Sequence, residues 1–257
     1  MRRIVAASVL GIALIAASVA FAARSGGAKA AAPAGLHAAV MRAATASSLR
    51  FDLTVQVAAA GVVPQTLHAR GASTADVKSV HLKVDDVTTS DGTKMTGPSA
   101  DEKIDGTFLY MRSTMTRPLV GPVWVRERLA GLGPKSAELQ TLRSVSARQL
   151  LTAFARARGV RAGAEAGVFH AWLPYADSTV RSALKGVEGD REYQHLRLTG
   201  WVGKDGRVSL LLLTGRTADR SAAFVLTLSL GGYGKPVAVT PPGQNNFVDF
   251  DLSKLST

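Results

Sequence analysis

Between residues 49 and 57 the side chains alternate without exception, apolar at every odd position and polar at every even one. Successive side chains of a strand point to opposite faces of its sheet, so this segment predicts a strand with one face in a core and the other in water. The same period of two returns in Val80, Leu82 and Val84 and in residues 224–230. The sequence therefore predicts an antiparallel sheet that is buried on one face.

Glycine and proline residues separate further strand-like runs along the chain. Runs rich in β-branched and aromatic residues occur at 107–112, 123–126, 193–202 and 207–215. Asp205 and Gly206 stand between the last two runs, and Asp-Gly is typical of a tight hairpin because glycine readily adopts a positive φ. Three segments have helical spacing instead, at about 35–46, 144–159 and 178–184.

The order of these segments predicts a single domain of the α+β class. A helix comes first and about four strands follow, then one or two helices and about four more strands. Strands joined by turns pair antiparallel, and their apolar face has to be covered by a second layer. We therefore expect residues 35–257 to form one large antiparallel sheet with helices on one side.

Residues 1–23 are typical of a secretion signal. Two arginines precede the stretch from Ile4 to Ala23, which contains no charged side chain and ends in the small-x-small pattern Ala20-Phe21-Ala22. Cleavage there leaves an Ala/Gly linker, 24–34, ahead of the domain. A stretch of this length also suffices to cross a hydrocarbon core of about 30 Å, so an uncleaved membrane anchor is the other interpretation. Both predict an extracytoplasmic domain.

The chain is basic and contains no cysteine. Lys and Arg number 31 against 19 Asp and Glu, a net charge of +12, which indicates an anionic neighbour such as a membrane surface, an acidic glycan or a cell-wall polymer. Nucleic acid is not predicted, because the basic residues are scattered singly and rarely adjoin an aromatic residue. Without cysteine there is no disulfide, no thiol chemistry and no thiol for lipid attachment, so an apolar core has to stabilise the domain.

The sequence contains no motif for catalysis, a metal or a cofactor. The histidines lack metal-ligand spacing, and no GxSxG segment is present. We interpret the pairs Asp85-Asp86 and Asp101-Glu102 as solvated loop charges, because neighbours on a strand point to opposite faces and cannot act together. We therefore predict a non-enzymatic protein with no catalytic residue, no metal site and no cofactor.

Residues Leu210 to Leu213 form an unbroken run of leucines. A strand wetted on one face would be less apolar, so two interpretations remain open. In the first, one face of this strand meets the helices and the other face lines something else. In the second, the strand is covered on both faces, as strands with continuous apolar runs often are.

Six segments follow one another in a characteristic order: a helix running into Ser48–Val55, then Asp105–Tyr110, Trp124–Arg126, Gln149–Leu151, Trp201–Val208 and Leu228–Pro242. In this order they resemble the LolA-like, LppX/LprG-type half-barrel family of extracytoplasmic lipid and lipoprotein carriers, over roughly residues 36–250. The resemblance implies a curved antiparallel sheet with helices packed on its concave side and an apolar cavity between them for acyl chains or an acylated peptide. This chain departs from the lipoprotein members because it lacks the lipidated cysteine.

Our leading hypothesis is a secreted or membrane-tethered protein that binds a lipid, an acyl chain or a lipidated partner in this cavity. The candidate lining consists of apolar side chains on the concave face: Leu53, Val55, Leu82, Val84, Leu226 and Leu228. Apolar burial, at about 25 cal/mol per Å², would drive binding. The alternative is an extracytoplasmic interaction or sensor module with a filled core, which binds a protein or an anionic cell-envelope polymer. The sequence does not predict the oligomeric state.

Overall fold

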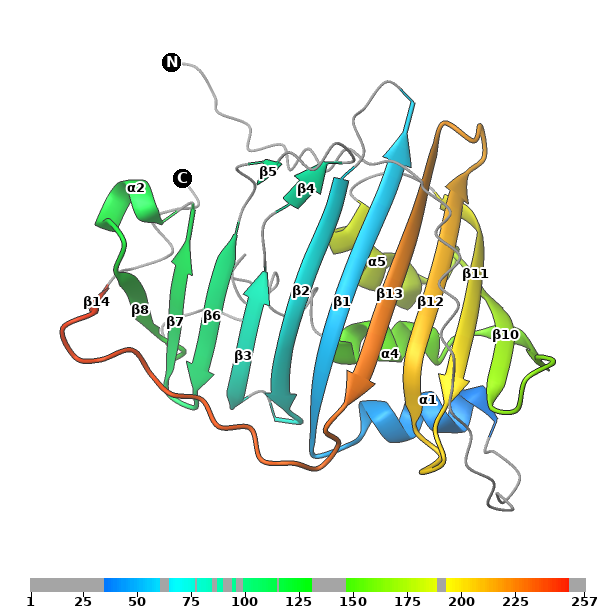
Figure 1. The fold of residues 1–257 in the computed structure, drawn as a ribbon, viewed down its shortest axis with the longest axis horizontal. Helices are drawn as coiled ribbons and strands as arrows, with labels where there is room; N and C mark the ends of the chain where they lie inside the picture. The colour runs from blue at the N-terminus through cyan, green and yellow to red at the C-terminus, as the bar shows by residue number, and fades with distance from the viewer. Residues whose placement is uncertain are drawn as a thin grey trace.

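The computed structural model describes residues 35–60, 65–76, 78–84, 87–89, 94–95, 99–114, 116–130, 147–188 and 193–249. A large curved sheet forms one layer, and helices form a second layer behind one half of it (Figure 1). The helices are α1 (Leu36–Ala44), α2 (Arg117–Val120), α4 (Ala147–Phe154) and α5 (Ser178–Glu188).

The strands belong to one open sheet. In chain order they are β1 (Ser48–Ala59), β2 (Gln65–Thr74), β3 (Ser79–Val84), β4 (Val87–Thr89), β5 (Lys94–Met95), β6 (Ala100–Asp105), β7 (Phe108–Ser113), β8 (Trp124–Arg128), β9 (Arg158–Ala162), β10 (Val168–Leu173), β11 (Tyr193–Val202), β12 (Val208–Thr217), β13 (Ala222–Gly231) and β14 (Phe247–Asp249). Their spatial order is β14-β8-β7-β6-β3-β2-β1-β13-β12-β11-β10-β9, with β4 and β5 attached beside β2. The pairing is antiparallel except between β14 and β8.

At the centre of the sheet, the register of β1 and β13 brings the alternating apolar side chains to one face. Leu53 pairs with Leu228 and Val55 with Leu226, and all four are 0–1% exposed. We call this the inner face, because α4 and α5 lie behind it (Figure 1). The opposite, outer face carries the polar residues in between, such as the exposed Asp52.

Close packing joins the helices to the inner face. Leu36 of α1 occupies the space beside Gly200 of β11, where a Cβ would collide with the leucine side chain, so a glycine is needed for the helix to approach. Arg148 of α4 donates hydrogen bonds from its two Nη atoms to the carbonyl oxygens of Ala44 and, at 2.7 Å, Ala46. Carbonyls at a helix end lack intrahelical partners, so this guanidinium caps α1 and fixes α4 against it.

The helices cover one half of the sheet. In Figure 1, α1, α4 and α5 lie behind β1 and β10 to β13, whereas no helix of the described residues lies behind β3, β6 and β7. We call β1 and β9 to β13 the helix-covered half, and β3 and β6 to β8, with β14 at their edge, the β3–β8 half. Inner-face side chains of the β3–β8 half are nevertheless buried, among them Leu82, Ile104, Leu109 and Val125.

The predicted fold class is confirmed: the protein is α+β, with a curved antiparallel sheet and helices on its concave side. The strands predicted at 49–57, 193–202 and 224–230 are present as β1, β11 and β13. The helix predicted to reach residue 159 is wrong at its C-terminal end, because α4 ends at Phe154 and β9 begins at Arg158. Gly159 in β9 has a φ of 60°, which a right-handed helix does not contain.

Several predicted features lie outside the described residues. These are the signal or anchor (1–23), the linker (24–34) and the pair Asp85-Asp86. Among the residues that the structure describes, no helix has both the length and the hydropathy that a membrane crossing requires.

Candidate functional site

The six predicted lining residues all lie on the inner face. Leu53 and Val55 belong to β1, Leu226 and Leu228 to β13, and Leu82 and Val84 to β3. Ala69 of β2 bridges the two groups, because it pairs with both Leu53 and Val84. Five of the six are buried and Val84 is half-buried against the same core. In this structure they are core side chains, and their role as the lining of a ligand cavity stays a prediction.

One carboxyl group lies among the apolar side chains of the inner face. The register places Glu102 of β6 between Leu82 of β3 and Met111 of β7. Glu102 is 8% exposed, and its Oε2 atom makes no hydrogen bond in the described structure. Burial, aided by the negative charge of Asp101, raises the pKa of Glu102 to about 7. Near neutral pH this group therefore changes between a neutral acid and a buried anion.

Asp101, the neighbour of Glu102, points to the outer face. Its carboxylate accepts from His81 Nε2 at 3.1 Å and lies 3.5 Å from Arg112 Nη2. The two carboxylates thus lie on opposite faces as predicted, but their interpretation as solvated loop charges is wrong, because both belong to β6. The signal was present in the sequence: Glu102 occupies the same strand phase as Ile104, which is the buried phase.

Across the strand ladder of the described residues, Glu102 has no second titratable group beside it on the inner face. Its neighbours across the ladder, Leu82 and Met111, are apolar, whereas general acid–base chemistry needs a reacting group within hydrogen-bond reach. Within the described residues, no group of three or more His, Asp and Glu side chains is arranged to hold a metal ion.

On the outer face of the β3–β8 half, cations already have partners. Trp124 is buried under Lys103 and Arg112, whose cationic groups lie 4.8 Å from the ring centroid. Arg126 donates two hydrogen bonds to Asp249, at 2.6 and 2.8 Å. The C-terminal segment crosses this face as well, since Lys103 Nζ donates to the carbonyl of Thr240 at 3.0 Å. This half therefore satisfies its own surface charges.

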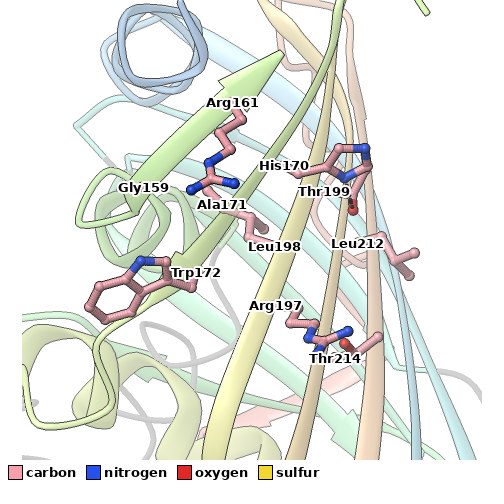
Figure 2. A pocket seen from close by; sticks show the side chains of 10 residues that line it. All are labelled: Gly159, Arg161, His170, Ala171, Trp172, Arg197, Leu198, Thr199, Leu212 and Thr214. Atoms are coloured by element: carbon pink, nitrogen blue, oxygen red, sulfur yellow. Dashed lines mark hydrogen bonds between the residues drawn. The ribbon is translucent and has the colours of Figure 1, made fainter. Parts of the chain in front are cut away.

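The outer face of the helix-covered half is hollowed by a groove of about 550 Å³ over β9 to β12. The register aligns His170, Thr199 and Leu212 in one row across three strands, and Trp172, Arg197 and Thr214 in the next. Figure 2 shows these side chains around the groove, with Arg161 of β9 at its edge. We call this feature the outer groove.

Trp172 is the large apolar side chain of the outer groove, and it is 47% exposed. Its indole packs on Gly159, where a Cβ would lie only 2.8 Å from Nε1. The guanidinium of Arg158 lies 5.9 Å from the ring centroid, within reach of a cation–π interaction. The backbone of β9 and an arginine thus hold a tryptophan that remains open to solvent.

Positive charge dominates the outer groove. Arg161 and Arg197 are exposed, and neither makes an ion pair within the described structure. The strands β9 to β13 contain no Asp or Glu. An anion approaching this surface therefore meets guanidinium groups without a competing carboxylate on the same strands.

The run of leucines from 210 to 213 contributes to both faces. Leu211 and Leu213 are buried on the inner face, while Leu210 and Leu212 are half-buried on the outer face. Leu212 lines the outer groove. Of the two interpretations of this run, the structure supports the one in which one face meets the core and the other lines a separate feature.

Similarity of this chain to known proteins is found in structure and not in sequence. No protein-family model matches the chain, and no curated protein matches it. Among solved structures, the crystal structure of a LolA superfamily protein from Nitrosomonas europaea is similar, with 11% sequence identity, a TM-score of 0.28 and coverage of 81% of this chain and 96% of that one. Because both the identity and the TM-score are low, the fold assignment rests on the strand order, register and helix placement described above.

Proposed function

We propose that this protein is an extracytoplasmic, non-enzymatic carrier that binds a lipid acyl chain or a lipidated partner against the inner face of the half-barrel. One observation carries the proposal: the inner face stays apolar across the β3–β8 half, where no described helix lies behind it. The apolar face of a sheet has to be covered by a second layer, and behind β3, β6 and β7 that layer is not one of the described helices. Leu82, Ile104 and Val125 are buried in this structure, so a ligand reaches them only when the inner face opens.

Glu102 gives this surface a polar contact point. In its neutral form the carboxyl group can donate a hydrogen bond to a carbonyl or hydroxyl group of a ligand. An acyl chain would pack against Leu82 and Met111, while a polar group of the same ligand would accept a hydrogen bond from Glu102. We assign residues 35–257 to this carrier domain, residues 1–23 to a signal or anchor and residues 24–34 to a linker. The finer relation to LppX/LprG-type carriers belongs to the same proposal.

Lipid extraction and native mass spectrometry of the purified protein test the proposal, together with a titration with a fluorescent fatty acid. We expect co-purified lipid or saturable binding of the probe. Val84→Glu adds an unpaired charge to a half-buried inner-face position and should weaken probe binding roughly tenfold. Met41→Glu, at an exposed position on α1 in the helix-covered half, is the control and should bind as the unsubstituted protein does. A lipid-free protein that also fails to bind the fluorescent fatty acid would end the carrier proposal.

A second candidate function is an interaction module with a filled core. It is favoured by the burial of Leu53, Leu226 and Leu228, which are 0–1% exposed. Such a module would bind a protein or an anionic envelope polymer through its surface, and the same lipid measurements separate it from a carrier.

A further inference from the structure

We propose that the outer groove is a docking site for the surface of an anionic phospholipid bilayer. Arg161 and Arg197 would bind lipid phosphates, and Trp172 would insert at the boundary between head groups and acyl chains. The outer groove lies on the opposite face of the sheet from the apolar inner face, so this inference stands or fails independently of the carrier function.

The first support is unbalanced charge. In the β3–β8 half, Arg112 and Arg126 lie against carboxylates at 3.5 and 2.6 Å, but Arg161 and Arg197 have no such partner in the described structure. Guanidinium groups match phosphate oxygens in a bidentate geometry, with planar N–H donors. An external anion can therefore supply the charge that this half of the sheet lacks.

The positive surface extends beyond the outer groove. Arg197 also lines an adjoining depression with Arg216 and Arg220, at the end of the β12–β13 hairpin. The outer groove and this depression thus form one strip along the outer face, with Arg197 shared between them. A strip of this kind suits an extended array of phosphates, as a bilayer surface presents, better than a single small anion.

The second support is the exposed indole. Tryptophan is enriched where membrane meets water, because one part of the ring is apolar and its N–H is polar. Trp172 is 47% exposed and lies beside Arg158 of the edge strand β9. Apolar and cationic side chains side by side on one surface are typical of proteins that bind anionic membranes.

Hydroxyl groups complete the surface between the arginines. Thr199 and Thr214 line the outer groove, and Thr199 Oγ1 is hydrogen-bonded to His170 Nδ1 at 3.1 Å. Threonine hydroxyls donate hydrogen bonds to phosphate oxygens in addition to charged donors. The outer groove therefore combines cations, neutral donors and an interfacial aromatic ring on one wall of the protein.

Tryptophan quenching by brominated lipid in vesicles tests this inference on the full chain. Residues 1–34 contain no tryptophan, so the signal reports on the domain even if the N-terminal segment also enters the bilayer. We expect strong quenching with vesicles of phosphatidylcholine containing about 30% phosphatidylglycerol and little quenching with phosphatidylcholine alone. Trp172→Phe should remove most of the quenching and so assign it to this side chain.

A pair of double variants measures the electrostatic part. Each arginine near an anionic bilayer contributes roughly fivefold in affinity, so R161Q/R197Q should weaken docking about 25-fold. R117Q/R181Q removes the same charge from exposed positions on α2 and α5 and should dock as the unsubstituted protein does. Circular dichroism of both variants checks that the fold is retained.

Three results would overturn the inference. Equal quenching with neutral and anionic vesicles would show that charge plays no part. Equal docking of R161Q/R197Q and R117Q/R181Q would show that net charge, rather than the outer groove, is responsible. Full displacement by millimolar glycerol phosphate would assign the outer groove to a soluble phosphate compound instead of a bilayer.

Discussion

The two halves of the sheet share the same alternation of side chains, but they differ in how the charged groups on each face are paired. The helix-covered half buries its inner face under α1, α4 and α5, and on its outer face Arg161 and Arg197 make no ion pair with another described residue. In the β3–β8 half, cations on the outer face lie against Asp101, Asp249 and aromatic rings. On the inner face of this half, the Oε2 atom of Glu102 has no hydrogen-bond partner in the described structure.

This contrast shows where unsatisfied groups gather in the molecule. Buried polar groups without partners and exposed like charges without counter-ions both cost free energy. Among the described residues, such groups are Glu102 Oε2 on the inner face of the β3–β8 half and Arg161 and Arg197 on the outer face of the helix-covered half. They lie on opposite sides of the sheet. The inner face of the β3–β8 half suits an apolar ligand with a polar end, and the outer face of the helix-covered half suits an anionic surface.

The largest expected effect is that of Leu211→Ala on the inner face of the helix-covered half. Leu211 is fully buried, so the cavity should lower the free energy of unfolding by about 2–5 kcal/mol. Leu82→Ala makes the same change in the β3–β8 half and should cost about 2 kcal/mol, because surroundings without a described helix can relax further. Urea denaturation measures both losses. Equal losses in the free energy of unfolding would show that the two halves do not differ in packing.

The second prediction concerns pH and Glu102. The pKa of this carboxyl is about 7 in the folded protein, against 4.5 for an ordinary glutamate in water. Between these pH values the folded state therefore retains a proton that the unfolded state releases. Stability should therefore fall as the pH rises from about 4.5 to 7, by up to roughly 3 kcal/mol. Glu102→Gln should remove this loss and be the more stable protein at pH 8. Parallel pH dependence in both proteins would contradict the burial of Glu102.

The third prediction tests the helix layer. Arg148 joins α4 to the C-terminal end of α1, and burial lowers the pKa of its guanidinium. Arg148→Met keeps an unbranched apolar stem but leaves the two carbonyls without donors, which should cost about 2 kcal/mol of unfolding free energy. Arg181→Met, at an exposed position on α5, should be close to neutral. Hydrogen exchange of α1 would locate the loss.

The smallest expected effect is that of Tyr233→Phe. The Tyr233 hydroxyl donates to the carbonyl of Val208 at 2.6 Å and links the segment after β13 to the start of β12. Loss of one neutral hydrogen bond should cost about 1 kcal/mol in thermal or urea unfolding. Because the bond lies in the helix-covered half, ligand binding at the inner face of the β3–β8 half should be unchanged.

Sequence patterns predicted some elements well and others poorly. β1 and β13 were predictable because a strand with one buried face imposes a strict period of two. β2 escaped prediction because Gln65–Thr74 contains few large apolar residues, and its inner face includes Ala69 and Gly71. Gly71 faces the ring of Phe51 on β1, where a Cβ would lie 2.9 Å from Cζ. A neighbouring strand thus supplies the apolar bulk that β2 itself lacks.

By itself the sequence determined the phase of β1 and β13, and with it which side chains of these two strands face the core. The tertiary structure alone decided which residues meet across strands: that Glu102 lies between Leu82 and Met111, and that Trp172 and Arg197 share one groove with Arg161. The physical reason is that alternation is a property of a single strand, whereas the charge balance of a surface depends on pairing between segments far apart in the chain.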